Sequence, residues 1–154
     1  MMGAEARLEE LGITVPDVVP PLAAYAPAVR TGNLVYTAGQ LPARDGEMIA
    51  VGKVGGSVTE EQGYECARQC ALNALAAIRA EIGSLDNITR VVKAVVFVAS
   101  TPDFTGQPKV ANGASDFLGE VFGDVGRHAR SAVGVPVLPL DVPVEVELIV
   151  EVAS

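Results

Sequence analysis

The C-terminal segment 144–152 constrains the fold most, because every second residue in it is valine or leucine. The residues between them are mostly glutamate. Strict period-two alternation is typical of a β-strand with one buried face. The opposite face carries Glu145 and Glu147, so it is acidic where a solvated face would usually mix charges. An earlier segment with Val133 and Val135 predicts a second strand, and a loop that contains proline joins the two. We therefore expect the chain to fold around a β-sheet.

Arg130 stands near the start of the earlier strand, next to residues with small side chains. If the two strands pair antiparallel with their valines facing the core, Arg130 shares the other face with Glu145 and Glu147. Ala132 and Gly134 then share this face, and the charges meet over a floor of small side chains. Such an arrangement is either a structural ion pair or a site for a small molecule, and the strand pattern alone favours neither.

The remaining segments predict strands and helices in a definite order. Thr59 and Gln62 have the spacing of a capping box, and Gly83 and Gly123 are placed to end helices. The expected elements are a short helix at 5–11, an extended proline-containing arm at 15–27, strands at 28–30 and 33–37, a short apolar segment at 48–51, a helix that begins at 59, a strand at 88–99 and a helix at 108–122. This order predicts an α+β fold with one mixed β-sheet and two helices packed on one face. No linker divides residues 1–154, so we expect a single domain.

Charge and hydropathy limit the partners that the chain can have. A formal net charge of -8 argues against nucleic-acid binding, which needs a cationic surface. No apolar run approaches the roughly 18–20 residues of a membrane span, and no secretory signal stands at the N-terminus, so we expect a cytoplasmic protein. The mean hydropathy of +0.35 is high for a small monomer. We therefore expect the uncovered sheet face to be buried against other copies of the chain.

The sequence offers no metal site. Cys66 and Cys70 are the only cysteines, and their spacing makes them neighbours on one helix face, unlike a redox C-x-x-C motif. With a single histidine, they do not complete a zinc site, so buried structural thiols are the favoured interpretation. The glycine-rich segment 52–57 lacks the lysine position and the helix start of a phosphate-binding loop, and a plain connector is expected there.

Four groups of residues carry a resemblance to known proteins. They are Tyr25 followed by Ala28-Val29-Arg30 and Gly32; the turn Ala38-Gly39-Gln40-Leu41-Pro42; Asn112 with Phe117 and Phe122; and Arg130-Ser131-Ala132-Val133 with Leu138-Pro139 and Val144-Glu145-Val146-Glu147. Together they resemble the Rid family (reactive intermediate deaminases, also called the YjgF or endoribonuclease L-PSP family). The fourth group is the most specific, because it combines a motif, a loop length and a strand pattern. The resemblance covers nearly the whole chain after about residue 18, which leaves residues 1–18 as an N-terminal extension.

The resemblance implies a chorismate-mutase-like fold, assembled as a homotrimer with sites at the subunit interfaces. Similar members hydrolyse enamines and imines derived from amino acids (2-imino acids), releasing ammonia and a 2-keto acid without a metal or organic cofactor. Arg130 matches the arginine that binds the substrate carboxylate, for which its planar guanidinium is suited. Glu145 matches the glutamate that holds and activates water. Gly39 matches a backbone N–H that lines the pocket, Tyr25 an aromatic wall residue, and Asn112 a helix asparagine near the interface.

Two residues differ from those of many members, since Ala38 stands where serine is common and Ala132 where cysteine is common. These differences keep a second hypothesis open, in which a non-catalytic or chaperone-like module binds small carboxylates in the same cleft. The ribonuclease activity implied by the older family name fits poorly with an acidic chain that lacks a histidine pair. Glu147 and Glu151 are expected to be structural or solvated, and His128 to be a surface or interface residue.

Overall fold

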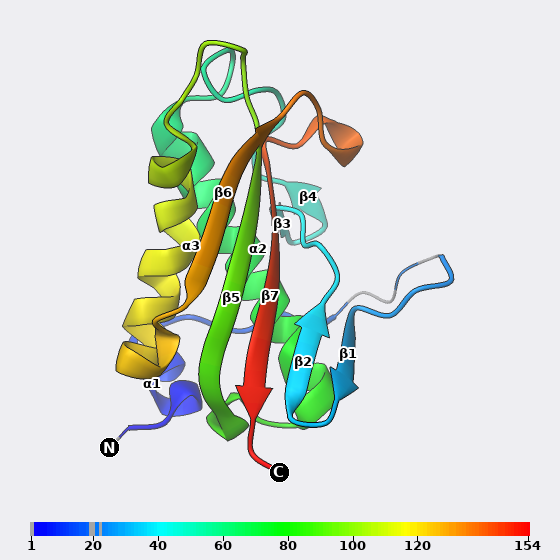
Figure 1. Ribbon diagram of the computed structural model, residues 1–154, viewed down its shortest axis with the longest axis vertical. Coiled ribbons are helices and arrows are strands. Elements are labelled where there is room, and N and C mark those ends of the chain that lie inside the picture. Colours follow the sequence, from blue (N-terminus) through cyan, green and yellow to red (C-terminus); the bar gives the residue numbers. More distant parts are fainter. Residues whose placement is uncertain (1, 19–20, 22) are drawn as a thin grey trace.

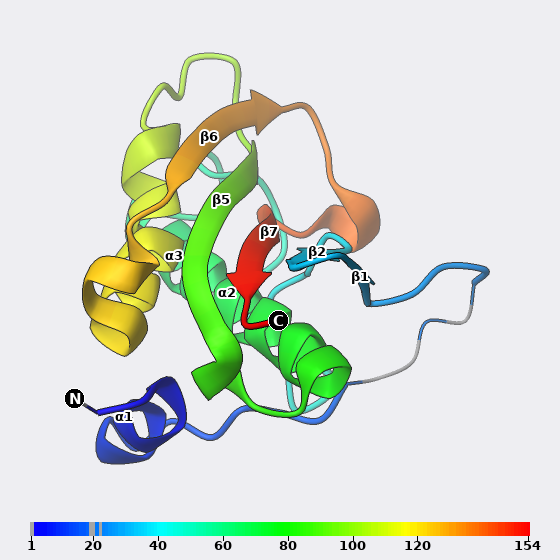
Figure 2. The same ribbon diagram turned by 60° about the horizontal axis from the view of Figure 1, so that its bottom comes forward.

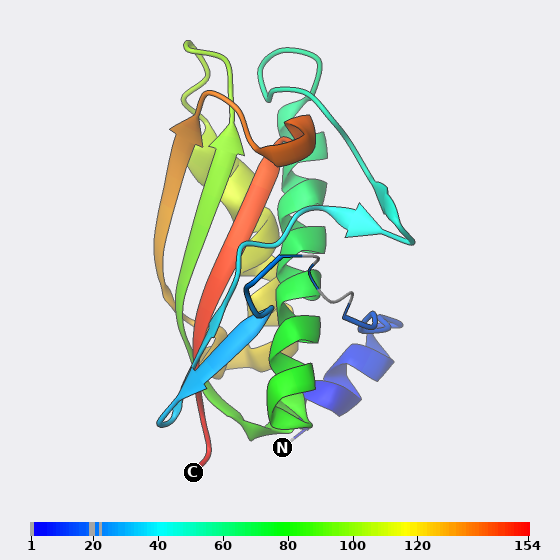
Figure 3. The same cartoon turned by 90° about the vertical axis from the view of Figure 1, so that its right-hand side faces the viewer.

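A five-stranded sheet with the order β1-β2-β7-β5-β6 forms the centre of the fold, and the helices α2 and α3 cover one of its faces (Figures 1 and 3). The structure, a computed structural model, describes residues 2–18, 21 and 23–154. The sheet contains β1 (Ala28–Thr31), β2 (Leu34–Thr37), β5 (Ile88–Ala99), β6 (Ala129–Val135) and β7 (Val144–Val152), and a separate hairpin contains β3 (Ala43–Arg44) and β4 (Glu47–Met48). The helices are α1 (Ala4–Glu10), α2 (Glu60–Ile82) and α3 (Gln107–Phe122), with 3-10 turns at Leu85–Asn87, Gly123–Gly126 and Pro139–Asp141. The predicted α+β fold with a mixed sheet is confirmed.

Helix α2 begins and ends where its local sequence predicts. The Thr59 hydroxyl accepts a hydrogen bond from the Gln62 backbone over 3.1 Å, and the Gln62 side chain accepts one from the Thr59 backbone over 2.8 Å, which completes the capping box. Gly83 follows the helix with φ of 89°, a conformation that side chains disfavour. Most of the buried residues of α2 are alanine or cysteine, so the helix lies close to the sheet and to α3.

Helix α3 packs against α2 at very short range. An added Cβ at Gly113 would lie 2.0 Å from the carbonyl oxygen of Tyr64, so only glycine fits at this crossing. The apolar face of α3 is buried, with Val110 and Phe117 among its members. A third, short helix, α1, lies beside the end of α3 (Figure 2). The Arg7 side chain on α1 donates a hydrogen bond to the Glu120 carbonyl over 2.9 Å.

The predicted pairing of the last two strands is wrong. Strand β5 lies between β6 and β7, pairing parallel with β6 and antiparallel with β7. The physical reason is that β5, α3 and β6 form a β-α-β unit, whose helical crossover brings the second strand parallel to the first. The loop between β6 and β7 then crosses the end of β5 through a turn in which Leu140 and Asp141 have positive φ.

This topology places Arg130 and Glu145 on opposite faces of the sheet. Arg130 aligns with Ala94, whose side chain is fully buried under the helices, whereas Glu145 aligns with Phe97 on the uncovered face. The expectation that the arginine and the glutamates share the non-core face is therefore wrong within one chain. Period-two alternation fixed the face of Glu145, but the β6 strand lies at the sheet edge and lacks a strongly alternating burial pattern.

The uncovered face of the sheet carries apolar side chains. Tyr36 and Val133 are 43% and 44% exposed there, and Phe97 and Ile149 are half-buried beside them. None of the helices in the described ranges is both long and apolar enough to cross a membrane. Of the apolar segment expected at 48–51, only Met48 belongs to a strand, the short β4, and the part of the arm at residues 19, 20 and 22 lies outside the described residues.

Candidate functional site

The side chain of Arg130 is held by two residues of α3. Its Nη1 donates hydrogen bonds to Asn112 Oδ1 over 2.8 Å and to Ser115 Oγ over 3.1 Å. Asn112 and Ser115 stand three residues apart on the helix, so both side chains project from the same face. The structure thus brings together two of the predicted site residues, Arg130 and Asn112. We had not predicted Ser115, although its helical spacing from Asn112 was a usable signal.

His128 extends this cluster. Its Nδ1 lies 2.6 Å from the Gly126 carbonyl oxygen, and its Nε2 lies 2.9 Å from Ser115 Oγ. A carbonyl oxygen can only accept, so Nδ1 carries the proton of this hydrogen bond, and Nε2 forms the hydrogen bond to the Ser115 hydroxyl. Ser115 Oγ thus joins His128 to Arg130, from which it accepts a hydrogen bond. We expected His128 at the surface or at an interface. In the structure its side chain is half-buried and bonded to Ser115 and Gly126.

Glu145 lies next to Gly39 on the β2–β3 connection. The bridge between Gln40 and Val146 holds this connection against β7, with backbone hydrogen bonds of 2.8 and 3.0 Å. An added Cβ at Gly39 would lie 2.8 Å from Glu145 Cδ, so the missing side chain leaves room for the carboxylate. No described residue donates a hydrogen bond to this carboxylate in the structure. Burial, and secondly the negative charge of Glu147, raise the pKa of Glu145.

Tyr25 and Gly39 meet at a pocket of about 460 Å³. Tyr25 is 60% exposed at its edge, and Ala38 and Gln40 contribute further wall. Arg130, Asn112 and Glu145 do not line this pocket. The predicted site residues therefore lie in separate places in a single chain: Arg130 with Asn112 beside α3 at the β6 edge, and Gly39 between Glu145 of the central strand β7 and the pocket that Tyr25 lines.

The described residues contain no group of three or more histidine, cysteine or acidic side chains that could hold a metal ion. Cys66 and Cys70 are both free thiols and both buried, as the sequence predicts. Burial raises the pKa of Cys66 to about 11 and that of Cys70 well above its ordinary value.

Comparison with known proteins gives consistent matches over nearly the whole chain. Residues 5–152 match the family described as "YjgF/chorismate_mutase-like, putative endoribonuclease". Protein TCP17 of Trypanosoma cruzi is 46% identical over 147 residues, which are 95% of this chain and 92% of that protein. A 2-iminobutanoate/2-iminopropanoate deaminase of Dermatophagoides farinae is 31% identical over 90% of this chain and 93% of its own length. The crystal structure of Atu1372 from Agrobacterium tumefaciens, a protein of unknown function, superimposes with a TM-score of 0.91 at 44% identity, covering 97% of this chain and 92% of that one.

Proposed function

Because this chain belongs to the YjgF/L-PSP (Rid) family, we propose that it hydrolyses small 2-imino acids and their enamines to 2-keto acids and ammonia, as a cytoplasmic homotrimer. The observation that carries this proposal is the Arg130 cluster. Asn112 and Ser115 hold one terminal nitrogen of the guanidinium at 2.8 and 3.1 Å, which orients the charged fork before any ligand arrives. A carboxylate is the group that such a fork binds best.

Glu145 supplies the base in this proposal. It binds a water molecule, whose oxygen forms a bond to the electrophilic imine carbon while the carboxylate takes the water proton. The carboxylate passes this proton to the imine nitrogen, which becomes an amino group. The new hydroxyl group then gives its proton through Glu145 to that nitrogen as the carbon–oxygen double bond forms, so the carbon–nitrogen bond breaks, and ammonia and the 2-keto acid leave. The raised pKa of Glu145 suits this role, because a weaker acid is a stronger base for the water proton. The Gly39 N–H and the Tyr25 ring line the place where the substrate lies.

A complete site requires two copies of the chain in this proposal, because Arg130 and Glu145 lie on opposite sheet faces. Strand β6 is an edge strand, so its outer side is available to a second copy. The exposed apolar residues of the uncovered face, Tyr36 and Val133, favour burial in the same contact. Closed rotational symmetry repeats one such contact around a ring, and we propose three copies. Sedimentation as a monomer at micromolar concentration would contradict the assembly.

The test of the reaction is ammonia release from imines that an amino-acid oxidase or a threonine dehydratase generates in the assay. Replacing Arg130 by glutamine should lower kcat/KM about 10- to 100-fold, because a hydrogen bond to a charged group contributes about 1.5–3 kcal/mol. The matched control is Arg127→Gln, which removes an exposed arginine three residues away. Equal rates for wild type and Arg130→Gln would refute the assigned role of Arg130.

The alanine side chains near Arg130 and beside Gly39 favour a second function. Ala38 precedes Gly39 and Ala132 lies two residues after Arg130, so neither a hydroxyl nor a thiol is offered there. A module that binds small carboxylates without hydrolysing them needs only the Arg130 fork. It predicts saturable binding of 2-keto acids, lost in Arg130→Gln, with no ammonia release above that of the uncatalysed reaction.

A further inference from the structure

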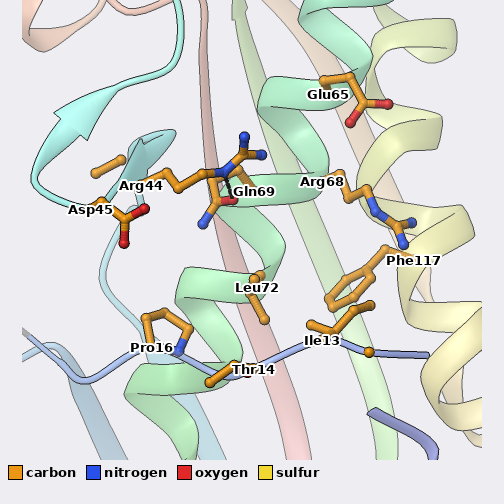
Figure 4. A pocket seen from close by; sticks show the side chains of 12 residues that line it. Ile13, Thr14, Pro16, Arg44, Asp45, Glu65, Arg68, Gln69, Leu72 and Phe117 are labelled. Atoms are coloured by element: carbon orange, nitrogen blue, oxygen red, sulfur yellow. Dashed lines mark hydrogen bonds between the residues drawn. The ribbon is translucent and has the colours of Figure 1, made fainter. Parts of the chain in front are cut away.

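A second pocket, of about 410 Å³, lies away from the Arg130 cluster, between α2, the β3–β4 hairpin and residues 12–16 (Figure 4). Its lining includes neither Arg130 nor Asn112, and neither Gly39 nor Glu145. Residues 12–16 belong to the N-terminal extension, so this extension builds one wall of the pocket. The volume is in the range of small-molecule sites, about 300–1,000 Å³.

Arg44 is held in this pocket by a chain of polar side chains. Its Nε donates to Gln69 Oε1 over 3.1 Å (Figure 4). The Gln69 amide in turn donates to Asn73 Oδ1 over 3.1 Å. Asn73 is fixed by hydrogen bonds of 2.9 Å to the carbonyls of Leu41 and Ala43. Gln69 is only 6% exposed, so packing and its hydrogen bonds fix the orientation of its side-chain amide. Within the described part of the chain, both terminal nitrogens of Arg44 remain without a partner.

The other charges of the pocket differ in how far they are already neutralised. Arg68 donates both terminal nitrogens to the Glu120 carboxylate at 3.1 and 3.4 Å, and its guanidinium stacks 4.9 Å from the Phe117 ring centroid. Asp45 and Glu65 form no ion pair with any described residue. The pocket therefore presents one free guanidinium fork and two free carboxylates.

Apolar side chains complete the lining. Ile13, Leu72 and Phe117 line the pocket together with the polar groups, and Figure 4 shows Ile13 and Phe117 on the side away from Asp45. A ligand that suits these groups carries a carboxylate for Arg44, a cation for one of the free carboxylates, and a compact apolar body for Leu72 and its neighbours.

We propose that this pocket binds a small zwitterionic α-amino acid with an apolar side chain. The Arg44 fork receives the α-carboxylate, and the α-ammonium group lies toward Asp45 or toward Glu65, which Figure 4 shows on opposite sides of Arg44. The aliphatic side chain covers Leu72 and Ile13, where its burial from water adds affinity. This inference stands independently of the proposed hydrolysis, because it uses a different pocket and different residues.

The experiment titrates the full-length protein in a calorimeter with L-leucine, and with two analogues that each lack one charge. The analogues are 4-methyl-2-oxopentanoate, which has no ammonium group, and 3-methylbutylamine, which has no carboxylate. L-leucine should bind at least about 10-fold more tightly than either analogue, since each analogue leaves a charged group unpaired. Absence of leucine binding, or tighter binding of the oxo acid through this pocket, would overturn the proposal.

Variants assign the binding to this pocket. Arg44→Gln should weaken leucine binding about 10-fold or more, and Asp45→Asn combined with Glu65→Gln should remove the preference for leucine over the oxo acid. Asparagine tolerates the positive φ of 54° at position 45, so the second variant keeps the turn. Leucine binding that disappears in Arg130→Gln but persists in Arg44→Gln would place the amino acid elsewhere and refute the inference. Methyl resonances of Ile13 and Leu72 in the unmodified protein, followed during the titration, give a readout that needs no variant.

Discussion

Gly39 and Glu145 touch so closely that a single additional carbon atom would collide with the carboxyl group. A Cβ on Gly39 would lie 2.8 Å from Glu145 Cδ and 2.9 Å from Oε1. The obstacle is the free end of a flexible side chain, and the rest of the fold does not depend on its position. The contact therefore ties the position of the proposed base to the absence of a side chain at Gly39.

Replacing Gly39 by alanine should displace the Glu145 carboxylate while leaving the fold stable. Misplacing a catalytic group by about 1 Å can cost 10²-fold in rate, so we expect a loss of about that size in ammonia release. The midpoint of thermal unfolding should change little. Gly119→Ala is the control, because an added Cβ meets nothing within 4 Å there. A rate for Gly39→Ala equal to that of the control would contradict the role of Glu145.

The pH dependence of kcat/KM should report Glu145. Its pKa is raised, first by burial and then by Glu147, and the base works only when ionised. The rate should therefore fall as pH falls through a value above the ordinary carboxyl range. Glu147→Gln should move this limb to lower pH, yet leave it above the ordinary range because burial remains. An unchanged limb in Glu147→Gln would show that another group titrates.

The same raised pKa affects stability with the opposite sense. The folded state keeps a proton on Glu145 that the unfolded state has already released, so the unfolded state binds fewer protons in this window. The free energy of unfolding should therefore decrease as pH rises from the ordinary carboxyl pKa through the raised one. Urea titrations at several pH values should show this slope in the wild type, and a smaller slope in Glu145→Gln.

Mixing two inactive variants should restore activity if a site takes Arg130 from one copy and Glu145 from another. When Arg130→Gln and Glu145→Gln chains are unfolded together in equal amounts and refolded, about a quarter of the sites in a symmetric ring combine two intact residues. Ammonia release should then reach about that fraction of the wild-type value. Each variant refolded alone is the control. Activity that stays at the level of the single variants would place both residues in one chain's site.

The two cysteines should be unreactive in the folded protein. Burial raises the pKa of Cys66 to about 11, so at about pH 8 only about one thiol in a thousand is ionised. Cys70 is fully buried, and its sulfur lies 3.6 Å from the Val144 carbonyl oxygen. Ellman's reagent should modify neither thiol in the native state and both in concentrated guanidinium chloride. Rapid modification of the native protein would show that α2 opens to solvent.

Local signals predicted the helices well, and long-range pairing was the part that failed. Thr59, Gln62 and Gly83 define α2 through contacts within a few residues, which the sequence displays directly. Alternation along β7 likewise shows which residues share a face. It does not show which strand lies alongside, because that depends on β5 and on the crossover through α3. Arg130 was therefore assigned to the wrong face.

The candidate site shows the same division. The motif resemblance selected Arg130 and Asn112, and their hydrogen bond of 2.8 Å exists in the structure. Ser115 and His128 belong to the same cluster, but neither stands in a motif. Their contact depends on how the end of α3 turns through residues 123–126 into β6, and no periodicity in the sequence encodes that turn.

Strand β5, which separates Arg130 from Glu145, gives the proposed activity a dependence on concentration. An isolated copy holds Arg130 on one face of its sheet and Glu145 on the other, so the two residues cannot act on the same substrate. By mass action, dilution below the dissociation constant of the assembly should therefore abolish the activity without unfolding the protein. A folded but inert protein at nanomolar concentration, active again on concentrating, is the behaviour that this single strand imposes.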